Sequence, residues 1–504
     1  MDHFIPMENV MRCCLIAVLL IALAGLTPAD DDEPGAPGRL IVAPNPISAY
    51  SICKILAGPE YAGRLTGHPG YTAAARWAAD QFRLWGLEPA FPGGYLQPFP
   101  APHTVLEAAE AVLYLPGATP EAPEREVRLE PNKDYLPLSF SDSGDHTAGM
   151  VFAGWGIAAP ELGYDDYAGI DPKGKFVLCF RGTPDPADDR FTDHDQHRTR
   201  LHTARERGAL GLIYIYEQPQ MNTNGDWLAG FTPAEISYAV ADQILAARSL
   251  TAKDLRDDLR RYRRPLSFEL PGRLHLRVVS HHVPDSQGYN IAAFIPGADP
   301  ALRDECVIVG AHFDGCGAHI GFIYPGANDN ASGAAVVLEL ARTMNLWPVK
   351  PRRTVVFVLF GGEETGLQGS HAFAAGLPYG LRRAAAMVNI DMAGAGAGAW
   401  CGYSATPPAV LQAVEAADAD AKIIGGKRAI TRVGVRSSDF APFFKLGIPC
   451  VSLSSDGPHL AYHEPGDTIY RINPEILGAM ARLTAGIAAN LADAVLSEAA
   501  PPTH

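Results

Sequence analysis

The chain has 504 residues, of which 47% are hydrophobic and 19% charged, with a formal net charge of -15. This length exceeds the needs of one hydrophobic core, so we expect two or three domains. The composition is that of a globular protein and excludes collagen-like, coiled-coil and wholly disordered chains. Such an acidic chain is a poor binder of phosphate backbones and anionic membranes, so we expect no nucleic-acid partner.

The N-terminal segment resembles an export signal. An apolar run from Leu15 to Leu26 follows Arg12, and small residues come after it. The run is too short to cross a bilayer but has the length of a signal-peptide core. We therefore expect a signal peptide over 1–29 and a flexible leader over 30–46. The mature protein would be secreted or periplasmic without stable membrane insertion; an uncleaved membrane anchor is the alternative.

Six cysteines follow this N-terminal segment, and none belongs to a Cys-X-X-Cys pair, so the sequence does not favour a cysteine zinc site. Cys179, Cys306 and Cys450 lie in apolar, strand-like runs, which is typical of buried free thiols. Disulfides remain open, because the sequence selects no pairing. The oligomeric state is not determined either.

The pattern of apolar residues changes along the chain. Helical periodicity runs from Tyr71 to Trp85, before Gly86. Over 131–270, short strand-like runs alternate with turn residues, and the charged stretch 190–202 has the composition of an exposed loop. From about 285, the runs ECVIVGAH, RTVVFVLFGG, AAAMVNIDMAG and IPCVSLSS have strand length, and helical stretches at 331–345 and 366–375 separate the first three.

Continuous apolar strands between helices predict a parallel sheet that is covered on both faces. We therefore expect an α/β catalytic domain from residues 47–130 and 271–495, with a mostly parallel central sheet flanked by helices. Residues 131–270 would form a mainly β insert that narrows access to the active site, and 496–504 a flexible tail.

Candidate metal ligands follow these strands. The first three strands lead into His312, Glu363-Glu364 and Asp391, while Asp329 lies in a glycine-rich loop and His463 in the loop after the fourth strand. The carboxyl ends of parallel strands meet at one edge of a sheet, so these side chains are expected to converge in one crevice. Any one of them alone is more often a surface residue or helix cap; their common placement favours a metal site.

The residue types suit zinc without thiolates, because histidine nitrogens and carboxylate oxygens are its usual other ligands. A shared carboxylate could hold two metals that polarise a scissile carbonyl and lower the pKa of a bridging water. Glu363 and Glu364 point in different directions from an extended backbone, so one could bind metal while the other takes the proton of that water.

Five motifs resemble those of peptidase family M28, the co-catalytic zinc aminopeptidases. They are GAHFD (310–314), GANDNASG (326–333), GGEETGLQGS (361–370), NIDMAG (389–394) and YHEPGDT (462–468), and EYAGRLTGHPGY (60–71) resembles the family's N-terminal segment. The resemblance implies an aminopeptidase that binds two Zn²⁺ per chain and hydrolyses peptides next to a free N-terminus. The region 163–182 with 207–216 resembles the protease-associated domain that some members carry as an insert.

The resemblance also implies individual roles. His312 and Asp391 would hold one zinc, Glu364 and His463 the other, and Asp329 would bridge them. Glu363 would be the general base, and Tyr462 would donate a hydrogen bond to the oxyanion. Asp314 would orient the imidazole of His312. The peptide bond after Asp329 would be cis.

The sequence departs from the family pattern in RSSDFAPF (436–443). There Asp439 keeps its place beside the metals, but Phe440 replaces a histidine, which we expect to alter the pocket wall and not the metal ligands. His319 and Cys316 also lie near His312 in the sequence. We expect His319 to be a surface or pocket-rim residue and not an extra ligand.

Three alternatives remain open. One is a glutaminyl cyclase-like acyltransferase with one zinc. Another is a carboxypeptidase or dipeptidase of the same family, which needs a basic residue for the substrate carboxylate; Arg432 and Arg436 are candidates. The third is a binding protein without metals, which the intact set of ligands disfavours.

Overall fold

The computed structural model describes residues 42–496, with gaps at 118, 120–121, 379 and 431–437. The predicted signal peptide, most of the leader and nearly all of the tail lie outside this part of the chain. Within it, no helix is long and apolar enough to cross a membrane. Cys53, Cys179, Cys306, Cys316, Cys401 and Cys450 are all buried and free, which confirms the prediction for the three strand cysteines.

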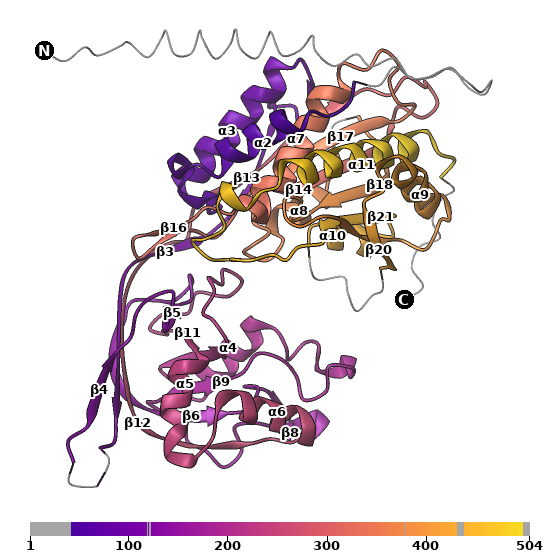
Figure 1. Cartoon of the computed structure of the whole chain (residues 1–504). Helices are drawn as coiled ribbons and strands as arrows, with labels where there is room; N and C mark the ends of the chain where they lie inside the picture. Colours follow the sequence, from indigo (N-terminus) through magenta and orange to yellow (C-terminus); the bar gives the residue numbers. More distant parts are fainter. Residues whose placement is uncertain (1–41, 118, 120–121, 379, 431–437, 497–504) are drawn as a thin grey trace, which may run out of the picture.

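The described chain folds into two modules, each built on its own sheet (Figure 1). We call residues 42–102 and 284–496 the core module and residues 103–283 the insert module. The long strands β3 (His103–Leu115) and β12 (Ser267–Val283) carry the chain out of the core module and back. The candidate ligands are all in the core module.

The core sheet has the strand order β1-β13-β17-β14-β18-β21-β19-β20, with β2 beside β13. Its central strands are β17 (Thr354–Phe360), β14 (Glu305–His312), β18 (Arg383–Ile390) and β21 (Cys450–Ser455), and they run parallel. On one side lie β1 (Glu88–Pro89), β2 (Leu96–Pro100) and β13 (Gln287–Ile295), and on the other β19 (Ala399–Tyr403) and β20 (Ile424–Ala429).

The predicted parallel arrangement holds for the centre of this sheet and for the pair β19 and β20, but not for the whole sheet. Strand β13 is antiparallel to β17, and β19 is antiparallel to β21. The connections 296–304 and 391–398 are short and contain no helix, so the chain turns back there. A parallel neighbour would need a longer crossover connection.

Helices cover both faces of the core sheet because its strands are apolar on both sides. Along β17, Val355, Phe357 and Leu359 pack into one hydrophobic cluster and the alternate residues into another. The first face carries α2 (Pro46–Leu56), α3 (Pro69–Leu84), α7 (Gly333–Met344), α9 (Ala409–Ala421) and α11 (Pro474–Asp493). The second carries α8 (Gln368–Ala374) and α10 (Phe440–Lys445).

The sheet of the insert module has the order β4-β3-β12-β6-β9-β10-β11-β5. The remaining bounds are β4 (Arg125–Arg128), β5 (Tyr135–Pro137), β6 (Gly144–Ala153), β9 (Phe176–Cys179), β10 (Gly211–Tyr216) and β11 (Ala234–Ser237). This sheet extends beyond the predicted bounds of 131–270 on both sides, because almost the whole of β3 pairs with residues 273–283 of β12.

The insert module is also more helical than the mainly β insert that the sequence predicts. It contains α4 (His197–Glu206), α5 (Tyr238–Leu245) and α6 (Ala252–Tyr262). Of the stretch 190–202, predicted as an exposed loop, residues 197–202 form the first part of α4. Its Arg200 is buried because the guanidinium donates to the carbonyl of Trp155 and pairs with Asp195 at 2.8 Å. Charge alone therefore misled the sequence prediction here.

Arg64 links the N-terminal segment to the loops beside the candidate ligands. Its side chain is fully buried and donates to the carbonyl oxygens of Phe313, Leu56, Pro325 and Gly326 at 2.6–2.9 Å. A buried cation requires such acceptors because it has lost its hydration. Two of the loops that it joins begin directly after His312 and contain Asp329, respectively.

We predict that Arg64→Met destabilises the protein by roughly 3 kcal/mol or more, since about four buried hydrogen bonds of about 1 kcal/mol each are lost. The melting temperature, followed by circular dichroism, would measure this loss. Arg83→Met is the control, because Arg83 pairs with Asp80 on the surface. Equal melting temperatures for the two variants would show that Arg64 does not hold these loops.

Candidate metal centre

The candidate ligands converge at the carboxyl edge of the parallel strands. His312 is the last residue of β14, Glu363 and Glu364 follow β17, and Asp391 follows β18 directly. Because these three strands are parallel neighbours, their ends lie side by side. The loops before α7 and after β21 bring Asp329 and His463 to the same edge.

Asp329 lies between the two histidines. Its Oδ1 is 3.0 Å from Nε2 of His312, and its Oδ2 is 3.3 Å from Nε2 of His463. Asp391 Oδ1 lies 3.4 Å from the same nitrogen of His312, and Glu364 Oε2 lies 3.1 Å from that of His463. We call His312 with Asp391 the first half-site and Glu364 with His463 the second; Asp329 faces both.

This arrangement fits metal ions. In the described chain, Nε2 of His463 is buried without a well-oriented hydrogen bond, although two carboxylate oxygens are near it. Burial lowers the pKa of His312, but the carboxylates of Glu363 and Asp391 outweigh this and raise it well above its usual value. The carboxylates thus attract positive charge to the cluster. Nitrogen and oxygen donors in this geometry suit zinc.

The first half-site is supported by other core-module residues. Ser438 donates a hydrogen bond to Oδ2 of Asp391 at 2.7 Å. Asp314 accepts the backbone N–H groups of Glu363 and Glu364 at 3.3 and 3.4 Å, and its Oδ1 lies 3.6 Å from Nδ1 of His312. The structure therefore places Asp314 on the predicted side of the imidazole, beyond normal hydrogen-bond length.

Asp467 is a supporting residue that the sequence interpretation missed. Its carboxylate accepts the backbone N–H groups of Asn328 and Asp329 at 2.9–3.1 Å, and burial raises its pKa to about 6. The peptide bond between Asp329 and Asn330 is cis, as the family resemblance implies. Asp467 stands in the motif YHEPGDT, so the motif contained the signal, although not the contact.

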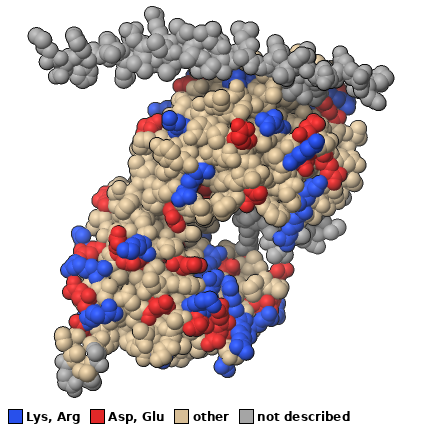
Figure 2. Space-filling view, in the orientation of Figure 1, with Lys and Arg blue, Asp and Glu red and all other residues tan. Residues whose placement is uncertain are grey.

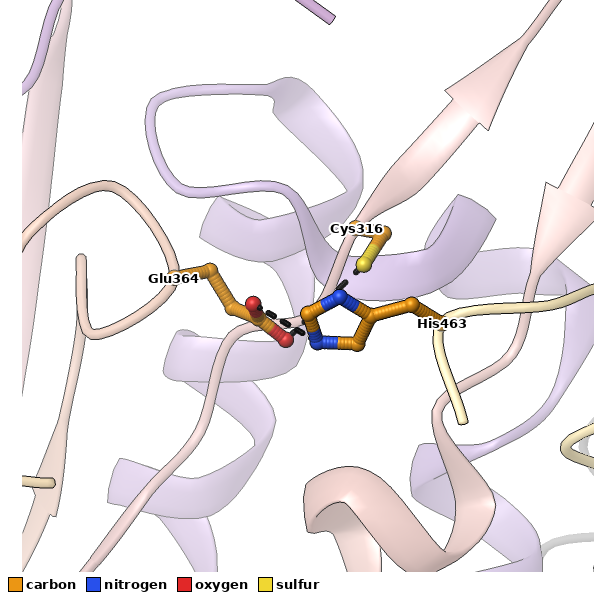
Figure 3. Close-up of side chains that lie close together, drawn as sticks. All are labelled: Cys316, Glu364 and His463. Atoms are coloured by element: carbon orange, nitrogen blue, oxygen red, sulfur yellow. Dashed lines mark hydrogen bonds and ion pairs between the residues drawn. The ribbon is translucent and has the colours of Figure 1, made fainter. Parts of the chain in front are cut away.

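The second half-site includes a thiol (Figure 3). Cys316 Sγ lies 3.8 Å from Oε1 of Glu364, and the three side chains Cys316, Glu364 and His463 form a cluster of metal-ligating types. In the figure the thiol faces one ring nitrogen of His463 and Glu364 faces the other. Cys316 therefore contacts the edge of the imidazole that is turned away from Asp329 and Glu364.

The other predicted residues take varied positions. Tyr462 is 38% exposed, and its ring stacks on that of His463. Asp439 is fully buried, and burial raises its pKa to about 7. Phe440 packs in the hydrophobic cluster on the second face of the core sheet and not among the candidate metal ligands. Arg432 and Arg436 lie outside the described residues.

His319 is neither a ligand nor a surface residue. It is buried, with Nδ1 accepting the backbone N–H of Leu106 at 3.1 Å and Nε2 donating to the carbonyl of Cys316 at 2.8 Å. Burial lowers its pKa to about 4, which keeps the ring neutral. The expectation that it lies on the surface or the pocket rim was wrong, because it joins β3 of the insert module to a core-module loop.

A cavity of about 320 Å³ lies between the two modules and opens onto the second half-site. The core module contributes Glu363, Glu364, Gly366, Leu367, Tyr462 and His463, and the insert module contributes Arg181, His197, Tyr216, Gln220, Met221, Asn222, Thr223, Asn224 and Glu235.

On the face shown in Figure 2, acidic and basic side chains are interspersed over both modules.

Comparison with known proteins finds similarity in the core module. Residues 290–488 match the family model of peptidase family M28. An aminopeptidase of Pseudomonas aeruginosa is 26% identical over 426 residues, covering 81% of this chain and 70% of that protein. Aminopeptidase YwaD of Bacillus subtilis is 32% identical over 211 residues, covering 40% and 43%.

Solved structures share the fold of almost the whole chain. The aminopeptidase from Aneurinibacillus sp. strain AM-1 has a TM-score of 0.60 at 24% identity, over 92% of this chain and 98% of that one. A peptidase M28 precursor from Shewanella amazonensis has a TM-score of 0.67 at 22% identity, over 90% and 95%. The fold of the core module together with the insert module therefore occurs in other proteins.

The buried Glu235 gives the protein a pH-dependent stability. Burial raises its pKa from 4.5 to about 8, so between these values the folded state keeps a proton that the unfolded state has lost. We predict that stability falls as the pH rises through this window, by roughly 4 kcal/mol in total. Between pH 5 and 9, the melting temperature of Glu235→Gln should fall less steeply than that of the wild type. If the two curves of melting temperature against pH are parallel, Glu235 is not the source of this pH dependence.

Proposed function

We propose that the protein is an exported zinc aminopeptidase that holds two zinc ions and hydrolyses the peptide bond next to a free N-terminus. The observation that carries the two-metal proposal is the position of Asp329, whose two oxygens face His312 and His463 separately. A carboxylate that bridges metals about 3.5–4 Å apart is typical of two-metal hydrolases. The match to the M28 family model and the aminopeptidases similar to this chain support the reaction class.

Glu363 is the general base of this proposal. It lines the cavity beside Glu364, and burial raises its pKa well above the usual value of a carboxyl group. Asp314 accepts the N–H groups of both glutamates, which fixes this corner of the backbone. Glu363 would take the proton of the attacking water and return it to the leaving amine.

The zinc ions would polarise the scissile carbonyl and lower the pKa of the attacking water. Tyr462 lines the same cavity and is the candidate donor to the oxyanion. The carboxylates of Glu363 and Asp391 would bind the α-amine of the substrate. A blocked N-terminus would lose this ion pairing, so we expect acetylated peptides to be poor substrates.

We predict that the mature protein contains two zinc ions per chain and that Glu363→Ala keeps both while its kcat falls about 10²- to 10⁴-fold. Zinc would be counted by elemental analysis, and activity measured on aminoacyl anilides and on free and N-acetylated peptides. Glu217→Ala is the control, since Glu217 is an acidic residue outside the cavity lining. One zinc without hydrolysis would favour the glutaminyl cyclase alternative.

One observation favours a dipeptidase-like preference as a second candidate. Among the lining residues, Arg181 is the one arginine, and it reaches the cavity from the insert module. Its Nε donates to Asp195 at 3.0 Å, which orients the guanidinium, and Nη1 contacts His197. Arginine is well suited to bind carboxylates. A peptide short enough to fit in the cavity could place its C-terminal carboxylate there.

We predict that the enzyme cleaves di- and tripeptides with a free carboxylate roughly tenfold or more better, by kcat/KM, than their C-terminal amides, because a charge-assisted hydrogen bond is lost with the amide. Arg181→Met should remove this difference. Arg190→Met is the matched control, since Arg190 pairs with Asp188 on the surface of the same module. If Arg181→Met keeps the preference for free carboxylates, Arg181 does not bind the substrate carboxylate. If the wild type shows no such preference, the protein is an aminopeptidase without the dipeptidase-like restriction.

A further inference from the structure

A loop of the insert module reaches the second half-site. It spans 217–233, between β10 and β11. The backbone N–H of Met221 donates to the carbonyl oxygen of His463 at 3.0 Å. The hydroxyl of Thr223 donates to the carbonyl oxygen of Glu364 at 2.7 Å and lies 3.4 Å from its Oε2. The loop therefore contacts both ligands of this half-site, and one of them through its carboxylate.

The same loop is packed firmly between the modules. The side chain of Met221 is fully buried in a small hydrophobic cluster with Leu136 of the insert module and with Cys316 and Tyr324 of the core module. The carbonyl oxygen of Met221 lies 3.9 Å from the thiol of Cys316, the residue that borders Glu364 and His463. Thr223 is 4% exposed. The side chains of Met221 and Thr223 are therefore held between the two modules.

Hydrogen bonds within the insert module fix the loop from behind. The backbone N–H of Gln220 donates to Oε2 of the buried Glu235 at 2.9 Å. The carbonyl oxygen of Asn222 accepts the backbone N–H of Ser139 at 3.2 Å. The insert module thus fixes the position of Thr223. The contact between the Thr223 hydroxyl and Oε2 of Glu364 in turn restrains that carboxylate.

The first half-site is supported differently. Among the described residues, the supporting side chains near His312 and Asp391 are Asp314 and Ser438, both of the core module. The two half-sites share Asp329, and Asp314 also accepts the backbone N–H of Glu364. The side-chain hydroxyls differ, because Ser438 bonds to Asp391 and Thr223 contacts Glu364. A change in the insert module can therefore reach one half-site without reaching the other.

We infer that the insert module is a structural part of the metal centre: through Met221 and Thr223 it positions Glu364 and His463, so that the affinity of the second half-site alone depends on it. This inference rests on the proposed two-zinc function. Thr223 is a positioning residue, since it acts through Glu364. Outer partners of metal ligands typically contribute 10- to 100-fold in metal affinity, because they hold the ligand in its binding orientation.

The test uses the full-length protein and measures zinc affinity by competition with a chromophoric chelator. The wild type should release zinc in two steps. Thr223→Val, which removes the hydroxyl and keeps the shape, should weaken one step roughly 10- to 100-fold, and Thr223→Ser should restore it. Ser438→Ala should weaken the other step instead. Asn132→Ala is the matched control, because it removes a 2.6 Å hydrogen bond between the modules, from Tyr324, away from the ligands.

Circular dichroism and melting temperatures would show that each variant is folded. If Thr223→Val weakens both steps equally, neither step, or the same step as Ser438→Ala, the inference is wrong while the two-zinc proposal stands. An equal effect of Asn132→Ala would also overturn it, since general loosening of the insert would then suffice. A single release step in the wild type would overturn the two-zinc proposal and this inference together.

Discussion

The crowding of buried carboxylates at one sheet edge is the constraint on which the rest of this structure depends. Asp314, Asp329, Glu364 and Asp439 are each at most 6% exposed. Like charges in so small a volume repel one another, and burial removes the water that would screen them. Divalent cations are the natural counter-charge, and the surrounding backbone must hold the carboxylates in place whether or not the cations are bound.

The parallel centre of the core sheet and a few buried polar side chains provide that support. Parallel strands deliver His312, Glu363 and Asp391 to one edge without further contacts. Loops are less constrained, and here Arg64 and Asp467 fix them through hydrogen bonds to backbone groups. These two residues carry opposite charges, and both form hydrogen bonds with backbone groups of the Asp329 loop.

The insert module changes how the metal centre should be understood. It supplies more than half of the residues that line the cavity, and its loop at 217–233 contacts the ligands of one half-site. Access to the cavity, the charge of its lining and the support of one half-site are therefore combined in one module. A module that only shielded the crevice would not need hydrogen bonds to Glu364 and His463.

The sequence by itself determined the parallel centre of the core sheet and the order of the candidate ligands, because strand periodicity and local motifs depend on near neighbours. Only the tertiary structure decided the antiparallel edge strands, the bounds of the insert module and the burial of His319 and Arg200. The supports Thr223, Ser438 and Asp467 also required it. Each of these contacts joins segments that are distant in the chain, and no local pattern specifies which distant backbone group a single threonine hydroxyl or carboxylate will meet.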